Sequence, residues 1–294
     1  MQPNLKTMKT FRTLFFLCIA LIAASCIKPT CHGNLDVRIS YTANGEPLVT
    51  DTLAYTNEAG NRYLVTEVQW FISNVSLCDE NGDTHPLGHI FYIDTNIPES
   101  QTLTVASLPC GHYTTLRFTF GLDQEDNVTG LFVNPPENNM FWPEALGGGY
   151  HYMKLNGKYL DASDNLVPLN IHLGIGQNAD HTQFYQNYFT VELPIDINIK
   201  EGENHLFLDM NIDHWFCNPH VYDFNTFGSA IMQNQKAQCI LKENGNDVFS
   251  TINHKPMKTL SEIGLQIMRM SAPEPHFFTW NNLKNHLENL KDRL

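Results

Sequence analysis

Three histidines stand in well-defined segments of this sequence, and an imidazole nitrogen is a common ligand for copper and zinc. His151 follows a glycine run and a tyrosine, His172 lies in an alternating apolar segment, and His214 directly precedes a tryptophan. The chain has 13 histidines, and on composition alone a hydrogen-bonded structural histidine is favoured over a ligand at each position. His151, His172 and His214 are therefore candidate metal ligands by position and chemistry.

Strand parity assigns two of these histidines to faces. If residues 150–155 form a strand, His151 shares a face with Met153 and Leu155, because side chains alternate along a strand. By the same rule His172 lies on the face opposite Ile171 and Leu173. Parity does not show which histidines converge on a metal.

No sequence motif indicates an enzyme. The chain has no G-x-S-x-G nucleophile motif, no glycine-rich phosphate loop, no H-E-x-x-H pair and no EF-hand loop. Catalytic residues are therefore not assigned, and we expect a protein without catalytic activity. A hydrolase built on Asp123, Glu125 and Asp126 remains an alternative.

A long segment at residues 121–149 interrupts the regular pattern. Loops of this length in a compact domain are usually functional or disordered, and this one contains Phe132, Phe141 and Trp142, which argues against disorder. Trp142 either fills the end of the domain or is displayed for recognition or chemistry. Exposed at the surface, Trp142, Tyr150 and Tyr152 would form a platform for sugars, which gives the alternative function of a glycan- or ligand-binding surface lipoprotein.

The remaining pattern predicts an all-β fold, an antiparallel β-sandwich with long functional loops and a short C-terminal helix. The predicted strands are short, rich in β-branched and aromatic residues, and separated by turn residues. Helical patterns occur at 232–241 and, more weakly, at 274–294. The predicted strands cover residues 35–41, 66–77, 102–105, 114–120, 150–155, 167–173, 188–193 and 205–212.

The N-terminus predicts export. Lys6, Lys9 and Arg12 precede an apolar run of about ten residues, too short for a permanent membrane span. Small residues then lead directly to Cys26, which resembles the bacterial lipobox, whose cysteine is acylated. We expect residues 1–26 to be a lipoprotein signal peptide, 32–252 a β-sandwich domain, and 253–294 a C-terminal extension with a peripheral helix. Lipidation of Cys26 predicts a protein anchored in the bacterial cell envelope, facing the periplasm or the cell surface.

Cysteine content and charge narrow the protein class further. Of seven cysteines, five remain after the signal peptide and the lipidation site, so at most two disulfides can form among them. Their pairing cannot be read from the sequence. The net charge of −13 disfavours nucleic acid as a partner. The five cysteines are Cys31, Cys78, Cys110, Cys217 and Cys239.

Several ordered motifs are similar to the MbnP-like copper-binding protein family, the methanobactin-associated periplasmic group. They lie at residues 55–57, 68–74, 121–123, 138–142, 149–157, 171–174 and 215–219, so the resemblance covers roughly residues 35–249. It implies a β-rich extracytoplasmic protein that binds a copper ion, Cu(I) or Cu(II).

The same resemblance implies a chemical modification and a partner. In some members a tryptophan is oxidised to kynurenine by a dihaem enzyme resembling MauG and bacterial cytochrome c peroxidases. Trp142 is the tryptophan that this implies here. Such members often carry a second aromatic residue soon after the tryptophan, whereas this chain has Pro143 and Glu144.

Overall fold

The computed structural model describes residues 31–251 except 179 and 181, and these residues form a β-sandwich. The seven-stranded sheet contains β12 (Phe189–Ile199), β7 (Gly111–Phe120), β4 (Arg62–Asp79), β8 (Met153–Leu160) and β9 (Leu166–Leu173) in that order, with β3 (Tyr55–Thr56) and β5 (Thr84–Asp94) also paired to β4. The five-stranded sheet contains β14 (Phe249–Thr251), β13 (Gly202–Asn211), β1 (His32–Ala43) and β2 (Glu46–Pro47), with β6 (Thr102–Pro109) beside β1.

Short elements connect these strands. A two-stranded sheet pairs β10 (Gly176–Gln177) with β11 (Phe184–Tyr185). The helical elements are η1 (Pro98–Gln101), η2 (Glu137–Met140), η3 (Glu144–Leu146), η4 (Asp213–Phe216), α2 (Phe224–Phe227), α3 (Gln235–Asn244) and η5 (Gly245–Asp247). Among the described residues, no helix is long and apolar enough to span a membrane.

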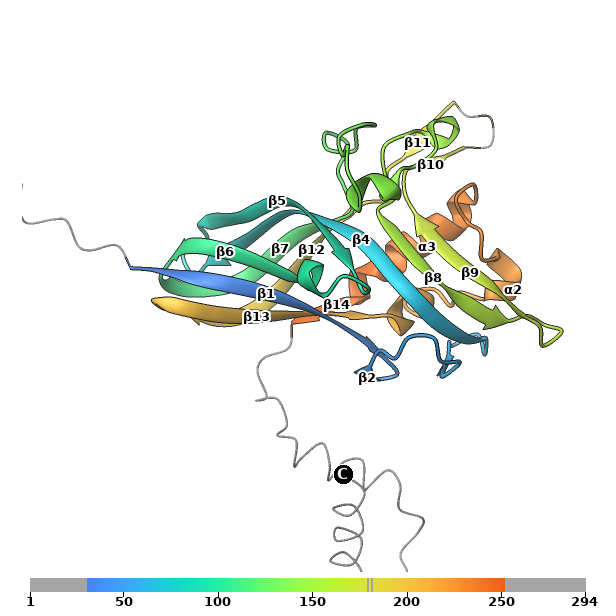
Figure 1. Cartoon of the computed structure of the whole chain (residues 1–294), viewed down its shortest axis with the longest axis horizontal. Helices are drawn as coiled ribbons and strands as arrows, with labels where there is room; N and C mark the ends of the chain where they lie inside the picture. The colour runs from blue at the N-terminus through green and yellow to red at the C-terminus, as the bar shows by residue number, and fades with distance from the viewer. Residues whose placement is uncertain (1–30, 179, 181, 252–294) are drawn as a thin grey trace, which may run out of the picture. The chain divides into compact units, whose positions relative to one another are not determined.

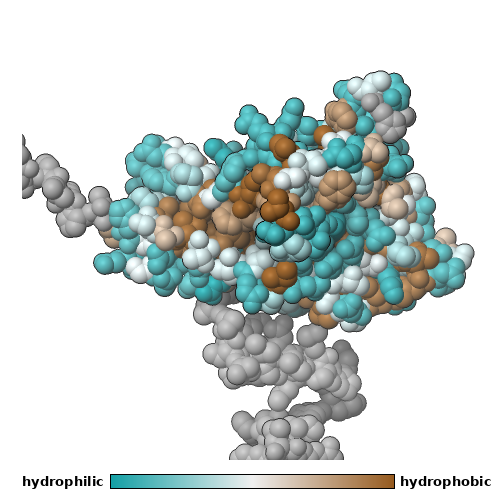
Figure 2. Space-filling view, turned by 45° about the horizontal axis from the view of Figure 1, so that its top comes forward, coloured by the Kyte–Doolittle hydropathy of each residue, from teal (hydrophilic) through white to brown (hydrophobic). Residues whose placement is uncertain are grey.

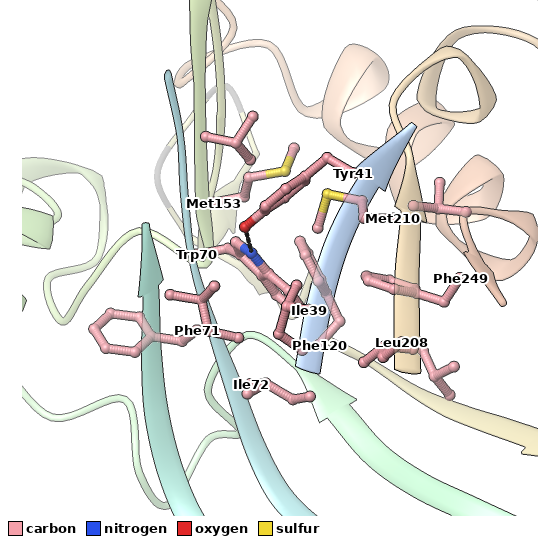
Figure 3. Packing of buried hydrophobic residues seen from close by; sticks show 14 of the residues in the cluster. Ile39, Tyr41, Trp70, Phe71, Ile72, Phe120, Met153, Leu208, Met210 and Phe249 are labelled. Atoms are coloured by element: carbon pink, nitrogen blue, oxygen red, sulfur yellow. Dashed lines mark hydrogen bonds between the residues drawn. The ribbon is translucent and has the colours of Figure 1, made fainter. Parts of the chain in front are cut away.

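The core lies between the two large sheets, because the strands alternate buried and exposed side chains. Along β1 every second residue from Gly33 to Ala43 is buried or directed inward, as the period of a strand requires. Trp70 of β4 and Tyr41 of β1 come from opposite sheets, and the indole Nε1 donates a 3.0 Å hydrogen bond to the Tyr41 hydroxyl. Figure 3 shows both rings among apolar side chains of the two layers. This bond satisfies two polar groups that burial would otherwise leave without water.

The central strand, β4, connects the sandwich to the candidate site. Its first half pairs with β8, and its second half pairs with β5 and β7. Figure 1 accordingly shows the β8–β9 hairpin continuing from one end of the layered region, beside the long β4. The chain segment after β7 returns to this hairpin, so the loop at 121–149 covers its open end.

The predicted fold class is confirmed. Seven of the predicted strands match β1, β4, β6, β7, β9, β12 and β13, and the eighth matches β8 only from Met153 onward. Strand β5 was not predicted, because Pro86 and Gly88 interrupt its alternation. The β1–β13 pair is parallel, a long-range feature that no local pattern reveals. The helix predicted at 232–241 corresponds to α3, and the one at 274–294 lies outside the described residues.

One disulfide joins described cysteines, between Cys31 and Cys110. Cys78, Cys217 and Cys239 have free thiols. This outcome lies within the limit of two disulfides, and it leaves three free thiols among the described residues. The acylation site predicted at Cys26 lies outside the described residues.

Apolar side chains also reach the surface. Figure 2 shows hydrophobic atoms gathered near the middle of one face, with hydrophilic atoms around them. Eight large apolar residues of the described chain are exposed, and four of them belong to the loop at 121–149. These four are Val128, Leu131, Val133 and Phe141.

Candidate metal centre

The loop at 121–149 is held in place by aromatic packing. Phe132 stacks on Phe71 of β4 with the ring centroids 5.2 Å apart and the ring planes 9° from parallel. The Phe132 backbone N–H donates a 2.8 Å hydrogen bond to the Tyr150 hydroxyl. Gly149 has φ 78°, and a Cβ there would come within 2.3 Å of the Asn127 side-chain oxygen. The loop therefore takes a defined course, which brings the chain to His151.

His151 lies just before β8 begins, in a short irregular segment. Its backbone N–H donates to the Met140 carbonyl at 2.6 Å, and its ring Nδ1 lies 2.9 Å from the same oxygen. Because His151 is outside the strand, the alternation of β8 does not fix its direction. The condition for assigning His151 to the face of Met153 and Leu155 is therefore not met.

His172 lies in β9, where parity does hold. Ile171 and Leu173 are buried, and His172 points to the opposite face with part of its ring exposed. The two imidazoles meet at the open end of the β8–β9 hairpin, with ring centroids 5.0 Å apart and ring planes at 83°. The structure thus brings His151 and His172 together.

Hydrogen bonds select the tautomer of each ring. A carbonyl oxygen can only accept, so His151 Nδ1 carries the proton toward Met140, and Nε2 keeps its lone pair. His172 Nε2 lies 2.8 Å from the side-chain oxygen of Asn156, whose amide nitrogen donates to Glu67 at 3.2 Å. His172 Nε2 therefore donates, and its Nδ1 keeps the lone pair. Each ring offers one nitrogen suited to a metal.

His151 Nε2 is buried and has no hydrogen-bond partner among the described residues. An unpaired buried polar atom is uncommon and calls for an explanation such as an ion or a functional role. The residue as a whole is 5% exposed, so bulk water does not satisfy the nitrogen.

Burial keeps both rings neutral. It lowers the pKa of His151 to about 3, and the positive charges of Lys154 and of protonated His172 act in the same direction, while the Met140 and Phe141 backbone oppose this shift. Burial also lowers the pKa of His172 to about 4, with Lys154 adding to the effect. Protons therefore leave both nitrogens at lower pH than for ordinary histidines. The sequence alone would place the competition between protons and metal in the ordinary histidine range.

Trp142 packs against His151 from within the protein. Its ring centroid lies 4.7 Å from that of His151 with the planes at 74°, and its Nε1 donates a 3.1 Å hydrogen bond to the Leu146 carbonyl. A Cβ on Gly174 would come within 2.5 Å of the indole, so this glycine permits the close fit. Trp142 has no exposed surface. Of the two sequence interpretations, filling the end of the domain is the one observed.

The aromatic platform of the alternative function does not form. Trp142 and Tyr152 are 0% exposed and Tyr150 is 2% exposed. Their rings belong to the core and cannot stack on a sugar at the surface.

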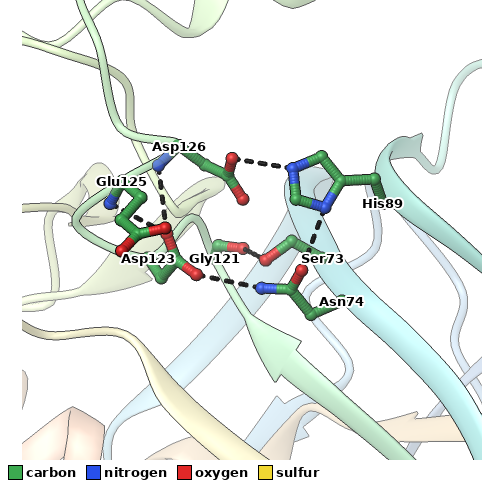
Figure 4. A network of polar contacts seen from close by, with 7 residues as sticks. All are labelled: Ser73, Asn74, His89, Gly121, Asp123, Glu125 and Asp126. Carbon is green, nitrogen blue, oxygen red and sulfur yellow. Dashed lines mark hydrogen bonds and ion pairs between the residues drawn. The ribbon is translucent and has the colours of Figure 1, made fainter. Parts of the chain in front are cut away.

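The carboxylates considered for a hydrolase stabilise a turn. Asp123 accepts hydrogen bonds from the backbone N–H groups of Glu125 and Asp126 at 2.9 and 3.0 Å. Asn74 donates to Asp123 at 2.9 Å, and His89 bridges Asn74 and Asp126 at 2.9 and 2.8 Å (Figure 4). These contacts tie the start of the loop to β4 and β5.

His214 lies elsewhere. It belongs to η4, where its Nδ1 is 2.7 Å from the Asp247 carbonyl. Within the described chain, no hydrogen bond or ring contact joins it to His151 or His172. The three predicted candidates thus become a pair and a separate surface histidine.

Sequence reasoning missed two neighbours of the pair, Lys154 and Asn156. Both lie on the outer face of β8, and Lys154 is the register partner of His172. The alternation of β8 would have placed them beside His172, had the β8–β9 hairpin pairing been known. In the described part of the chain, no three side chains of His, Cys, Asp or Glu come together as a metal site. The available nitrogen donors are therefore two neutral imidazoles, and imidazole is a ligand type that suits copper.

These features define a class: a β-sandwich protein with two neighbouring neutral imidazoles, one of which is buried against a tryptophan. The MbnP family model matches residues 32–237, and the chain belongs to this family. A solved structure described as MbnP from Methylosinus trichosporium is 15% identical, with a TM-score of 0.47, and the match covers 64% of this chain and 79% of that one. No curated protein matches the chain.

Proposed function

We propose that this protein binds one copper ion through His151 and His172, and that it acts as a copper-holding protein without catalytic activity of its own. The observation that carries the proposal is the buried Nε2 of His151, which has no hydrogen-bond partner among the described residues and belongs to a ring that contacts the ring of His172. Family membership supports a copper-related role. Copper also heads the affinity order of the divalent first-row metals for nitrogen ligands.

The side chains around the pair are suited to keeping both ligands ready. The Met140 carbonyl and the Asn156 amide fix the tautomers that leave His151 Nε2 and His172 Nδ1 free. Burial removes the protons that would compete with the ion. When bound, copper supplies a redox-active centre, and this chain supplies its orientation and its shelter from water.

The test is copper stoichiometry in protein purified with and without added copper. We expect about one copper per chain in the wild type, and none in the His151→Ala, His172→Ala double variant, because both imidazole ligands are gone. His214→Ala is the matched control, since it removes a histidine that lies apart from the pair. Equal copper content in the double variant and the wild type would refute the assignment of the site.

We also propose that Trp142 is the residue a dihaem partner resembling MauG and cytochrome c peroxidases would oxidise to kynurenine. Two molecules of hydrogen peroxide, reduced to four molecules of water at the partner, would accept the four electrons and four protons removed from the indole. Two water molecules would supply the two oxygen atoms that are added as the indole C2–C3 double bond breaks. Hydrolysis would then release one carbon as formate. Because Trp142 is fully buried, the electrons would leave through the protein, past the exposed Phe141 that precedes it.

The exposed apolar residues of the loop at 121–149 support a partner surface near Trp142, since such groups favour protein contacts. Peptide mass spectrometry on protein co-expressed with the dihaem partner would test the oxidation. An unmodified Trp142 with copper bound would remove the oxidation and leave copper binding in place.

Finally, we propose that acylated Cys26 anchors the protein in the cell envelope, with the sandwich outside the cytoplasm. The support is the small-residue run before Cys26 and the position of the family match, which begins at residue 32. The Cys26→Ala variant should move from the membrane fraction to the soluble fraction of the envelope. Retention of this variant in the membrane, without a labelled acyl chain, would contradict the anchor.

A further inference from the structure

A cavity of about 440 Å³ lies apart from the histidine pair and is partly open to solvent. Its walls come from η3, from the β10–β11 hairpin and from the segment that leads into α3. Its volume falls within the range of about 300–1,000 Å³ that is usual for small-molecule sites. The residues that line it are Leu146, Gln177, Asn178, Tyr185 and residues 232–235.

The lining of this cavity is polar but uncharged. Five of its eight residues carry a side-chain amide. The chain has 31 acidic residues, yet among the described residues that line the cavity there is no carboxylate, lysine, arginine or histidine. An ion would find no opposite charge here, whereas an amide can both donate and accept hydrogen bonds. The lining therefore suits a neutral polar ligand.

Structural hydrogen bonds hold two of these amides in place. Asn234 caps α3, since its side-chain oxygen accepts from the Ala237 backbone N–H at 3.1 Å. The side-chain oxygen of Asn178 accepts from the backbone N–H groups of Thr182 and Gln183 at 2.9 and 2.8 Å. Both side chains are therefore fixed before any ligand arrives.

The start of α3 is also tied to the hairpin. The Gln235 amide nitrogen donates a 3.1 Å hydrogen bond to the side-chain oxygen of the buried Asn187. A Cβ on Gly176 of β10 would come within 1.5 Å of the Gln235 side-chain oxygen, so this glycine allows the helix and the hairpin to lie close together. A cavity with fixed walls binds at a lower entropic cost than one that must be ordered by its ligand.

The same contacts indicate which hydrogen-bonding groups a ligand would meet. The side-chain oxygens of Asn178 and Asn234 are engaged by backbone N–H groups. Their amide nitrogens each have two N–H groups and donate one hydrogen bond among the described residues, to Thr182 and to Phe227. The amides therefore favour a ligand that carries a hydrogen-bond acceptor such as a carbonyl oxygen.

We propose that this cavity binds a neutral sugar that carries an acetamido group. The acetamido carbonyl accepts from the amide N–H groups, and the sugar hydroxyls both donate and accept. The partly buried Leu146, Met232 and Tyr185 supply two aliphatic chains and an aromatic ring, which contact the acetamido methyl group and the C–H face of the sugar ring. This is a second binding site, and it does not depend on the proposed copper function.

The test measures binding of N,N′-diacetylchitobiose to the full chain by isothermal titration calorimetry. Cellobiose is the matched ligand, because it has the same two-ring framework with hydroxyls in place of the acetamido groups. We expect saturable binding of N,N′-diacetylchitobiose and about tenfold weaker binding of cellobiose, roughly the effect of one or two hydrogen bonds between neutral groups. Equal affinity for the two sugars, or no binding of either, would overturn the proposal.

Substitutions at Gln233 test the location of the site. The Gln233 side chain lines the cavity, is exposed, and makes no hydrogen bond within the described part of the chain, so its replacement should leave the fold unchanged. We expect Gln233→Ala to weaken N,N′-diacetylchitobiose binding by about three- to tenfold, since it removes one amide. Gln233→Trp should abolish binding, because the indole would fill the cavity.

Gln124→Ala is the matched control, because it removes an exposed amide that lies outside the cavity. Its sugar affinity should equal that of the wild type. Copper content should stay the same in all three variants, since neither His151 nor His172 lines the cavity. Wild-type sugar affinity in Gln233→Trp would overturn the assignment of the site, whatever the copper content of the protein.

Discussion

His151 and His172 lie against neutral partners, whereas His112 lies between two carboxylates at the surface. His112 Nδ1 is 3.2 Å from Glu80, and its Nε2 is 2.9 Å from Asp196. Hydrogen bonds to Asp196 and Glu80 raise the pKa of His112, while burial lowers the pKa of the other two. The same side chain is thus a proton-holding group in one region and a neutral nitrogen donor in the other.

The comparison shows which histidines of this chain are available to a metal. Both nitrogens of His112 are engaged by anions that favour the protonated ring. Each ring of the pair has one nitrogen bonded to a carbonyl or an amide and one nitrogen left free. A nearby carboxylate would favour the protonated imidazole over the neutral one. In the described part of the chain, the ring nitrogens of His151 and His172 form no hydrogen bond to a carboxylate.

The largest expected difference between the regions is in acid stability of the metal-free protein. The folded-state pKa of His151 lies below its unfolded value, so the unfolded chain binds more protons as pH falls from about 6.5 toward 3, and stability is lost over that window. By about pH 4.5, protonation of His151 in the unfolded chain should lower the free energy of unfolding by about 2–3 kcal/mol. Denaturant unfolding at pH 7 and pH 4.5 measures this loss.

The variant His151→Leu should show a flatter pH dependence over that window, because it has no proton to bind. The variant His112→Gln tests a histidine whose pKa is shifted in the opposite direction. The raised pKa of His112 contributes stability that is present below its unfolded pKa and is lost as pH rises through the folded value. If stability fell equally with pH in the wild type and in His151→Leu, the lowered pKa of His151 would be contradicted.

A single substitution should make the environment of His172 more like that of His112. Asn156→Asp replaces the neutral partner of His172 by a carboxylate of the same shape. An opposite charge at hydrogen-bond distance raises a histidine pKa by about one to three, so His172 should titrate near the ordinary range instead of near 4. NMR titration of the ring protons measures the change, with Asn170→Asp on β9 as a comparison. A His172 pKa that stays near 4 would contradict the assigned contact.

The smallest expected effect is at the surface. Asp196→Asn removes the first of the two carboxylates that raise the pKa of His112, so this pKa should fall modestly, since solvent screens exposed charges. Copper content should stay the same. A change in copper content with this variant would mean that the two histidine environments are coupled, which the contacts described above do not indicate.

The strand pattern and several site residues were accessible from sequence because they depend on local periodicity. The alternation in β9 placed Ile171 and Leu173 inward and His172 outward, as observed. The aromatic content of the loop at 121–149 correctly argued for order, and Phe132 stacks on Phe71.

The sequence could not predict that His151 and His172 lie side by side, and the reason is physical. His151 lies in an irregular segment whose direction is set by the Met140 carbonyl, a contact across 11 residues of loop. The separation of His214 from the pair depends on how η4 packs against Asp247, a contact across 33 residues. Such contacts are determined by tertiary packing rather than by the period of a strand.

The disulfide between Cys31 and Cys110 would have a mechanical consequence if the proposed lipid at Cys26 anchors the chain. β1 begins at His32, next to Cys31, while Cys110 joins the end of β6 in one sheet to the start of β7 in the other. A pull on the tether would reach both sheets at once through this covalent link. The parallel hydrogen bonds between β1 and β13 would then be loaded together rather than opened one after another from the end.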